Sequence, residues 1–113
     1  MRAFLLSVAL LCLGCLAIAQ PTPTAFDYNA EGSRLFQSGK LDEAIPYFDV
    51  AIKMNPDVSA FHFNLGFTFF IQKRYFKAVP SLQMAIQLDS SPSAAALQTL
   101  ASALFRSGYC LPL

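Results

Sequence analysis

Apolar residues recur at spacings of three and four after Leu41, where Ala44, Phe48, Ala51 and Ile52 fall on one face of a helix. The same spacing returns in later segments and is interrupted by short runs of glycine, proline, serine and asparagine. This pattern therefore predicts an all-α fold. The predicted helices cover about residues 26–37, 41–54, 58–72, 75–88 and 92–106.

The helix ends are predicted from particular turn residues. Gly39 and Gly108 end helices because glycine adopts the left-handed conformation without a steric penalty. Lys73 stands where the second turn is expected to have a glycine. Asp42 and Glu43 begin the second helix, where carboxylates oppose the positive end of the helix dipole.

Proline has two expected roles. Pro46 and Pro80 lie inside predicted helices, but near their starts, where few internal hydrogen bonds are lost. Pro92 suits a first helical position, so the last helix is expected to begin there.

The chain repeats itself at a shift of 34 residues. The matching pairs are Gly32 and Gly66, Leu35 and Phe69, Ala44 and Ala78, Pro46 and Pro80, Ala51 and Ala85, and Ile52 and Ile86. A third copy follows at a shift of 35, with Leu65 matched by Leu100, Gly66 by Ala101 and Phe69 by Leu104. A period of this length is typical of stacked helix-turn-helix units.

The resulting organisation has three parts. Residues 1–19 are a predicted signal peptide, residues 20–25 a flexible lead, and residues 26–110 a repeat domain. The units of that domain cover about residues 25–58 and 59–92 and, for the partial third unit, 93–110.

The first nineteen residues predict export. Arg2 precedes an apolar run, and Ala17 and Ala19 provide the small residues before a cleavage site ahead of Gln20. The localisation expected from this is periplasmic or extracellular. The alternative is a lipid-anchored membrane protein, because Leu13, Gly14 and Cys15 resemble the end of a bacterial lipoprotein signal.

Composition limits the remaining functions. Without Arg2 the chain has seven basic and seven acidic residues, and no attraction to nucleic acid is expected. His62 is the sole histidine and falls at a packing position of the repeat. Metal-ligand spacing, glycine-rich phosphate loops and nucleophile motifs are lacking. The sequence therefore predicts no enzyme, no cofactor and no metal site. Cys110 is the one cysteine expected after cleavage, so no internal disulfide is expected.

The repeat resembles the tetratricopeptide repeat family, in which bulky, small and aromatic residues occupy fixed positions of each unit. The first unit offers Tyr28, Gly32, Leu35, Ala44, Phe48, Ala51 and Pro56, and the second offers His62, Leu65, Gly66, Phe69, Ala78, Leu82 and Ala85. Glu31 departs from the pattern, because the family prefers leucine there. The resemblance implies a short right-handed α-solenoid of about two and a half antiparallel units.

The resemblance also implies a binding surface, because the first helix of each unit lines the concave face in this family. By position that face would include Asn29, Phe36, Phe63, Asn64, Phe67, Phe70, Gln98 and Phe105. Phenylalanines at the centre and amides around them suggest a groove for a peptide segment of another protein. The competing interpretation is that these phenylalanines only pack against one another.

A subset of the family clamps the carboxylate of a chaperone tail. Asn64 matches one clamp residue, but Asn29, Ala95 and Thr99 replace the expected cations, so that activity is not expected here. The last helix is expected to expose some of Leu97, Leu100 and Leu104. Self-association through this third unit, or truncation from a longer chain, is therefore a second hypothesis.

Overall fold

The protein forms a stack of α-helices. The computed structural model describes residues 21–108, which contain five helices and no strand. The helices are α2 (Ala25–Gln37), α3 (Leu41–Met54), α4 (Ser59–Ile71), α5 (Tyr75–Leu88) and α6 (Ala94–Arg106). The all-α fold predicted from the sequence is confirmed. The predicted signal peptide, Cys15 and Cys110 lie outside the described residues.

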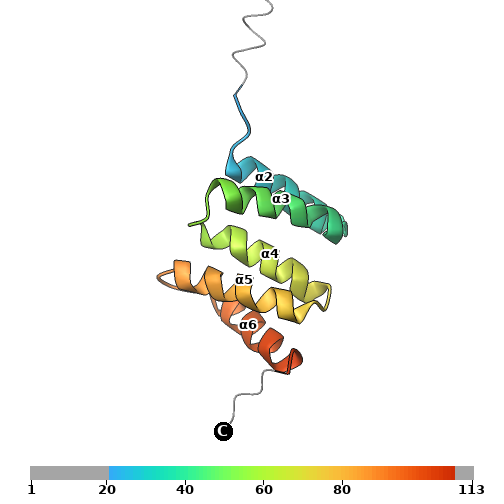
Figure 1. Ribbon diagram of the computed structural model, residues 1–113, viewed down its shortest axis with the longest axis vertical. Coiled ribbons are helices and arrows are strands. Elements are labelled where there is room, and N and C mark those ends of the chain that lie inside the picture. Colours follow the sequence, from blue (N-terminus) through green and yellow to red (C-terminus); the bar gives the residue numbers. More distant parts are fainter. Residues whose placement is uncertain (1–20, 109–113) are drawn as a thin grey trace, which may run out of the picture.

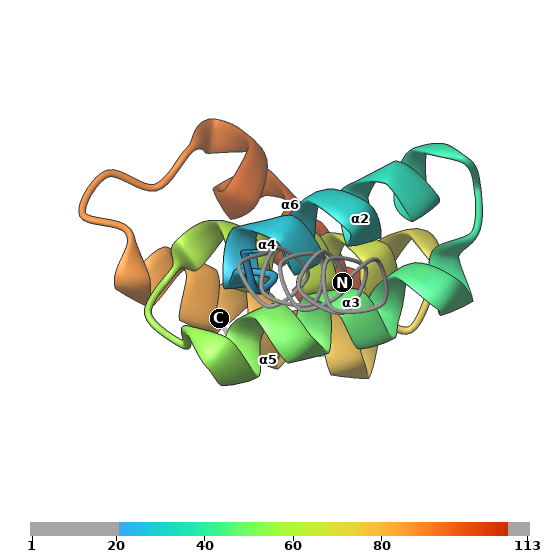
Figure 2. The same ribbon diagram turned by 90° about the horizontal axis from the view of Figure 1, so that it is seen from above.

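The helices follow one another along the long axis of the molecule (Figure 1). Seen along that axis, α2 and α6 lie on one side of the stack and α3 and α5 on the other (Figure 2). The central helix α4 packs against all four of the others. Its sequence is apolar on most sides for this reason, since neighbours cover it in several directions. No helix in residues 21–108 has the length and hydrophobicity required to cross a membrane.

Within each unit the two helices meet at a glycine. A methyl group built on Gly32 would lie 2.7 Å from a ring carbon of Phe48, and one on Gly66 would lie 2.8 Å from Cγ of Leu82. Both pairs are related by the 34-residue shift. The repeated glycines therefore exist because a large side chain of the second helix packs directly on the backbone of the first.

The turns after α2, α4 and α6 share one backbone conformation. Gly39 and Gly108 have φ values of 79° and 82°, and Lys73 has a φ value of 62°. The expectation that Lys73 takes the place of a turn glycine is confirmed. A side chain in this left-handed region costs roughly 1–2 kcal/mol relative to glycine.

The last helix begins later than predicted. α6 starts at Ala94, and Pro92 lies before it in the connection from α5. Ser93 caps the helix, because its hydroxyl oxygen accepts a hydrogen bond of 3.2 Å from the backbone N–H of Ala96. Serine satisfies an otherwise unpaired helical N–H, which proline at the first position does not do.

A second cap was missed at the sequence level. Thr24 and Asp27 form a reciprocal capping box at the start of α2. The backbone N–H of Thr24 donates to Oδ2 of Asp27 at 2.7 Å, and the backbone N–H of Asp27 donates to Oγ1 of Thr24 at 3.3 Å. The backbone N–H and then the hydroxyl of Thr24 hold the pKa of Asp27 below its ordinary value.

The outer helix α6 is only partly covered. Leu100 and Leu104 pack against the core formed with α5, whereas Leu97 is 48% exposed and Phe105 is 77% exposed. Leu97 therefore meets the expectation of an exposed apolar side on the third unit. Phe105 is also exposed, further along the same helix.

Candidate peptide-binding groove

Three phenylalanines of α4 form a row on the face toward α2 and α6. The rings of Phe63 and Phe67 stack with centroids 5.7 Å apart and planes inclined by 10°. The rings of Phe67 and Phe70 follow at 6.4 Å and 13°. Residues four and three apart share one face of a helix, so the spacing in the sequence produces the row. We call Phe63, Phe67 and Phe70 the aromatic row.

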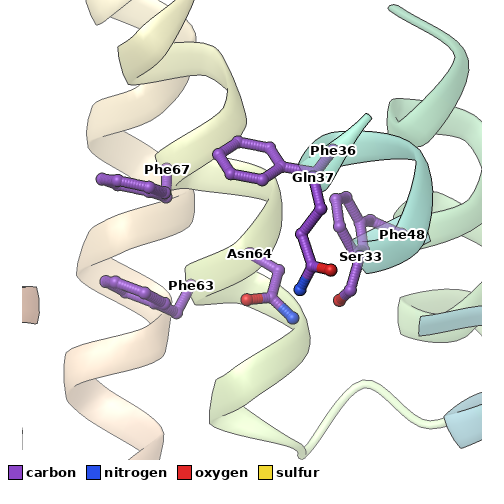
Figure 3. Close-up of a pocket in the computed structure, with 7 residues that line it drawn as sticks. All are labelled: Ser33, Phe36, Gln37, Phe48, Phe63, Asn64 and Phe67. Atoms are coloured by element: carbon purple, nitrogen blue, oxygen red, sulfur yellow. The ribbon is translucent and has the colours of Figure 1, made fainter. Parts of the chain in front are cut away.

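A hollow opens between this row and helix α2. Its volume is about 280 Å³. The residues that line it are Ser33, Phe36, Gln37, Phe48, Phe63, Asn64 and Phe67 (Figure 3). The Phe36 ring approaches that of Phe67 to 5.7 Å between centroids, and Phe48 is buried beneath. We call this the α2/α4 hollow. It combines aromatic walls with two amides and a hydroxyl, which is the composition of many ligand sites.

A hydrogen bond joins the two sides of the hollow's polar edge. Nδ2 of Asn64 on α4 donates to Oδ1 of Asn29 on α2 at 2.8 Å, in a partly buried setting. Among residues 21–108, neither Oδ1 of Asn64 nor Nδ2 of Asn29 has another hydrogen-bond partner. One acceptor and one donor are thus held in place beside the aromatic surface, where they match the N–H and C=O of an extended peptide.

The other predicted site residues lie further along the same side. Phe70 and Gln98 line a second hollow of about 230 Å³ with Ala95, Thr99 and Ser102. Phe105 lines a third, open hollow on α6 with Gln98, Ala101, Ser102 and Arg106. The structure therefore brings Phe36, Phe63, Asn64 and Phe67 together, keeps Asn29 beside them, and separates Phe105 from them.

Two aromatic residues of the candidate groove were not predicted from the sequence. Phe48 forms part of the wall of the α2/α4 hollow, although it belongs to the second helix of its unit. Tyr75 extends the aromatic row, because its ring meets that of Phe70 at 5.6 Å with an angle of 64° between the planes. The resemblance to the family implies a site on the first helix of each unit alone. Residues contributed by α3 and α5 fell outside that rule.

The features that depart from the family pattern have structural roles. Glu31 accepts from Nε of Arg34 at 3.0 Å, and this hydrogen bond from the guanidinium lowers the pKa of the carboxyl group. Nε2 of His62 lies 2.8 Å from the carbonyl oxygen of Pro56, which ties α4 to the preceding turn. Within residues 21–108 no three acidic, histidine or cysteine residues gather as metal ligands.

Comparison with known proteins agrees with this geometry. The family model described as "Tetratricopeptide repeat" matches residues 29–95. The first TPR of Spaghetti (RPAP3) bound to HSP90 peptide SRMEEVD is similar with a TM-score of 0.71 and 23% identity, over 76% of this chain and 68% of that one. The second TPR of the same protein, bound to the same peptide, is similar with a TM-score of 0.72 and 22% identity, over 76% of this chain and 79% of that one. At such identities the likeness concerns the fold alone. The search of curated proteins gave no significant match.

Proposed function

Since the chain belongs to the tetratricopeptide repeat family, we propose that it is an interaction scaffold that binds a peptide segment of another protein and catalyses no reaction. The observation that carries this proposal is the α2/α4 hollow. Aromatic surface there adjoins the unused acceptor of Asn64 and the unused donor of Asn29. An extended peptide requires both kinds of contact, apolar pockets for its side chains and partners for its backbone.

The energetics favour an apolar side chain as the anchor. Phe36, Phe63 and Phe67 are partly buried and flank an open volume of about 280 Å³. Burying one large apolar side chain contributes about 1.5–3 kcal/mol. The amide pair adds direction rather than much affinity, because a neutral hydrogen bond contributes about 0.5–1.5 kcal/mol net.

The structural neighbours support a peptide as the type of partner. Both domains of Spaghetti (RPAP3) are described with a bound HSP90 peptide. In the present chain Asn29, Ala95 and Thr99 occupy the positions where the carboxylate clamp has cations. We therefore propose a peptide held by its apolar side chains in this hollow, and no clamp of that kind.

Selection of binding peptides, followed by affinity measurements, tests the proposal. A library of random peptides displayed on phage is selected on the immobilised protein, and the affinities of the enriched peptides are measured by fluorescence polarisation. We expect enriched peptides with aromatic or aliphatic side chains, and a loss of about tenfold or more in affinity for Phe67→Ser. The matched control is Phe26→Ser, because Phe26 is exposed at the start of α2, outside the hollow. Equal affinity for Phe67→Ser and the unchanged protein would refute the proposal.

We further propose that the scaffold acts after export, in the periplasm or outside the cell. The support is the basic start, apolar run and small residues of the first nineteen residues. Mass spectrometry of the protein recovered from the exporting cell tests it. We expect an N-terminus at Gln20, whereas a lipidated Cys15 would indicate the membrane-anchored alternative and an intact Met1 would exclude both.

A second candidate function is self-assembly through the third unit. The observation in its favour is the exposed apolar side of α6, with Leu97 and Phe105. Light scattering over a concentration series tests it. A dimer that dissociates in the double variant Leu97→Gln and Phe105→Gln would support self-assembly, and a monomer at every concentration would contradict it. Leu100 and Leu104 are unsuitable for this test, because they pack against the core with α5.

A further inference from the structure

Four cations surround one hollow at the end of the aromatic row. Lys73, Arg74 and Lys77 come from the α4–α5 turn and the start of α5, and Arg106 comes from the last turn of α6. The hollow has a volume of about 260 Å³. Its remaining lining residues are Tyr75, Phe76 and Ser107. We call it the basic hollow.

Three of the four cations of the basic hollow lie against aromatic rings rather than acids. The Arg74 guanidinium and the Lys77 ammonium lie 5.0 and 5.8 Å from the centre of the Phe69 ring. Arg106 lies 5.8 Å from the Tyr75 ring centre and donates from Nη1 to the Tyr75 hydroxyl at 3.2 Å. These contacts hold the cations without neutralising them.

The acidic residues of the described part of the chain do not pair with the cations of the basic hollow. Within residues 21–108 none of its four cations forms an ion pair, and the ion pair that is present joins Arg34 and Glu31 on α2. One carboxylate, that of Asp42, is connected to these cations through hydrogen bonds. It accepts a hydrogen bond of 2.6 Å from Gln72, whose own oxygen accepts one of 3.2 Å from Nη1 of Arg74. Asp42 therefore reaches Arg74 only through an intervening amide.

The first unit shows that this charge is specific to one turn. At the 34-residue shift, Lys73 replaces Gly39 and Lys77 replaces Glu43. The other changes in the turn are Arg74 for Lys40 and Phe76 for Asp42. The turn of unit one thus carries one cation and two acids, while that of unit two carries three cations and no acid. The rest of the fold does not require this difference, since both turns have the same backbone conformation.

A chain of side-chain contacts leads from the aromatic row to the basic hollow. Phe67 contacts Phe70, Phe70 contacts Tyr75, and Tyr75 binds Arg106. A peptide that follows the aromatic row from the α2/α4 hollow would therefore reach the cations at its end. We propose that the basic hollow binds the carboxylates of an acidic stretch in the same partner peptide, next to its apolar anchor. This inference rests on the proposed function only in that the apolar anchor of the peptide occupies the α2/α4 hollow.

Size and charge balance favour a peptide over a longer polyanion. The hollow is small, and outside it the described basic residues Arg34, Lys40 and Lys53 belong to α2, the following turn and α3. Nucleic acids are usually bound by a longer stripe of cations than one turn and one helix end provide. The occupant expected here is a short run of glutamate or aspartate.

Two labelled peptides test the charge contribution. They share an apolar stretch of leucine and phenylalanine and end in a run of either glutamates or glutamines. We expect the glutamate peptide to bind about tenfold more tightly at low salt, and the advantage to disappear at an ionic strength of about 1 M. The triple variant Arg74→Gln, Lys77→Gln and Arg106→Gln should abolish the advantage. Lys40→Gln, at the position equivalent to Arg74, should keep it.

A crosslinking experiment on the unchanged protein does not depend on how the triple variant folds. It also does not depend on binding in the α2/α4 hollow. A short glutamate peptide without an apolar stretch is activated with a carbodiimide, which joins a carboxylate to a lysine amine in contact with it. We expect crosslinks at Lys73 or Lys77, also in Phe67→Ser. Crosslinks confined to Lys40 and Lys53 would overturn the inference while leaving the groove proposal intact. A single-stranded oligonucleotide that competes as strongly as the glutamate peptide would also overturn it.

Discussion

Asn64 of α4 donates a hydrogen bond of 2.8 Å to Asn29 of α2, across the boundary between the first and second repeat units. The bond links two first helices that otherwise meet at few points, and it lies at the edge of the α2/α4 hollow. The pair therefore fixes the relative position of the surfaces that we propose to bind a peptide. It also leaves one donor and one acceptor available for that peptide.

Removing one member of this pair should weaken the protein. In Asn64→Ala the partly buried Asn29 amide loses its partner, and we expect the free energy of unfolding to fall by about 1 kcal/mol. Urea denaturation of Asn64→Ala, Asn29→Ala and the double variant measures the coupling between the two residues. If the two single effects add without coupling, the hydrogen bond does not join the units in solution.

The repeat glycines should be intolerant of a methyl group. Gly32→Ala and Gly66→Ala place a carbon within 3 Å of Phe48 and Leu82 respectively, and we expect each to destabilise by about 1–3 kcal/mol. Alanine normally stabilises a helix interior relative to glycine, so the sign is informative. Thermal unfolding checks it. An increase in Tm for either variant would show that the helices do not pack this closely.

The turn before α5 should gain stability from glycine. Lys73 adopts the left-handed conformation with a φ of 62°, and Lys73→Gly should stabilise by about 1 kcal/mol. The comparison is Lys40→Gly, because Lys40 does not have a positive φ. Urea denaturation at moderate salt separates the relief of backbone strain from the loss of the lysine charge, because salt screens charge interactions. No gain for Lys73→Gly would mean that this turn adopts another conformation in solution.

Stability should fall at acid pH in part because of the cap on α2. Hydrogen bonds from Thr24 hold the pKa of Asp27 below its ordinary value of 3.8, so the folded state binds protons less readily than the unfolded state. The contribution is therefore complete above about pH 4 and is lost as the pH falls through the lowered value. Asp27→Asn should remove it, and the exposed carboxylate variant Asp57→Asn is the control. Parallel pH profiles for Asp27→Asn and the unchanged protein would contradict this.

The helices were predictable because they depend on local patterns. Apolar periodicity and the 34-residue shift placed α5 at Tyr75–Leu88 and ended α2 at Gln37, as the structure has them. The predicted start of α6 at Pro92 was wrong, since Pro92 and Ser93 both suit a helix start and the capping hydrogen bond decides between them. A capping bond depends on side-chain geometry, which the spacing of residues does not give.

The candidate site was predictable only where its residues occupy repeated positions. Position within the unit selected Phe36, Phe63, Asn64 and Phe67, which do meet around one hollow. It could not show that Asn29 bonds to Asn64 or that Arg106 bonds to Tyr75, because these contacts depend on how neighbouring units are rotated. Nor could it show that Tyr75 meets Phe70, because that contact depends on how the two helices of one unit pack. Lys73, Arg74 and Lys77 are close together in the sequence, but their meeting with Arg106 around one hollow could not be predicted for the same reason. Arg106 is distant in sequence from the α4–α5 turn and comes beside it only through packing of α6 on α5.

The central claim is that a partner peptide occupies the α2/α4 hollow. The most direct measurement is an NMR titration of the isotope-labelled protein with a peptide enriched by phage selection. The largest chemical shift changes are expected at Phe36, Phe63, Asn64 and Phe67, with smaller changes on the opposite side at α3 and α5. Changes confined to the outer surface of α3 and α5, or to α6 around Leu97, would contradict the account and assign binding to another face.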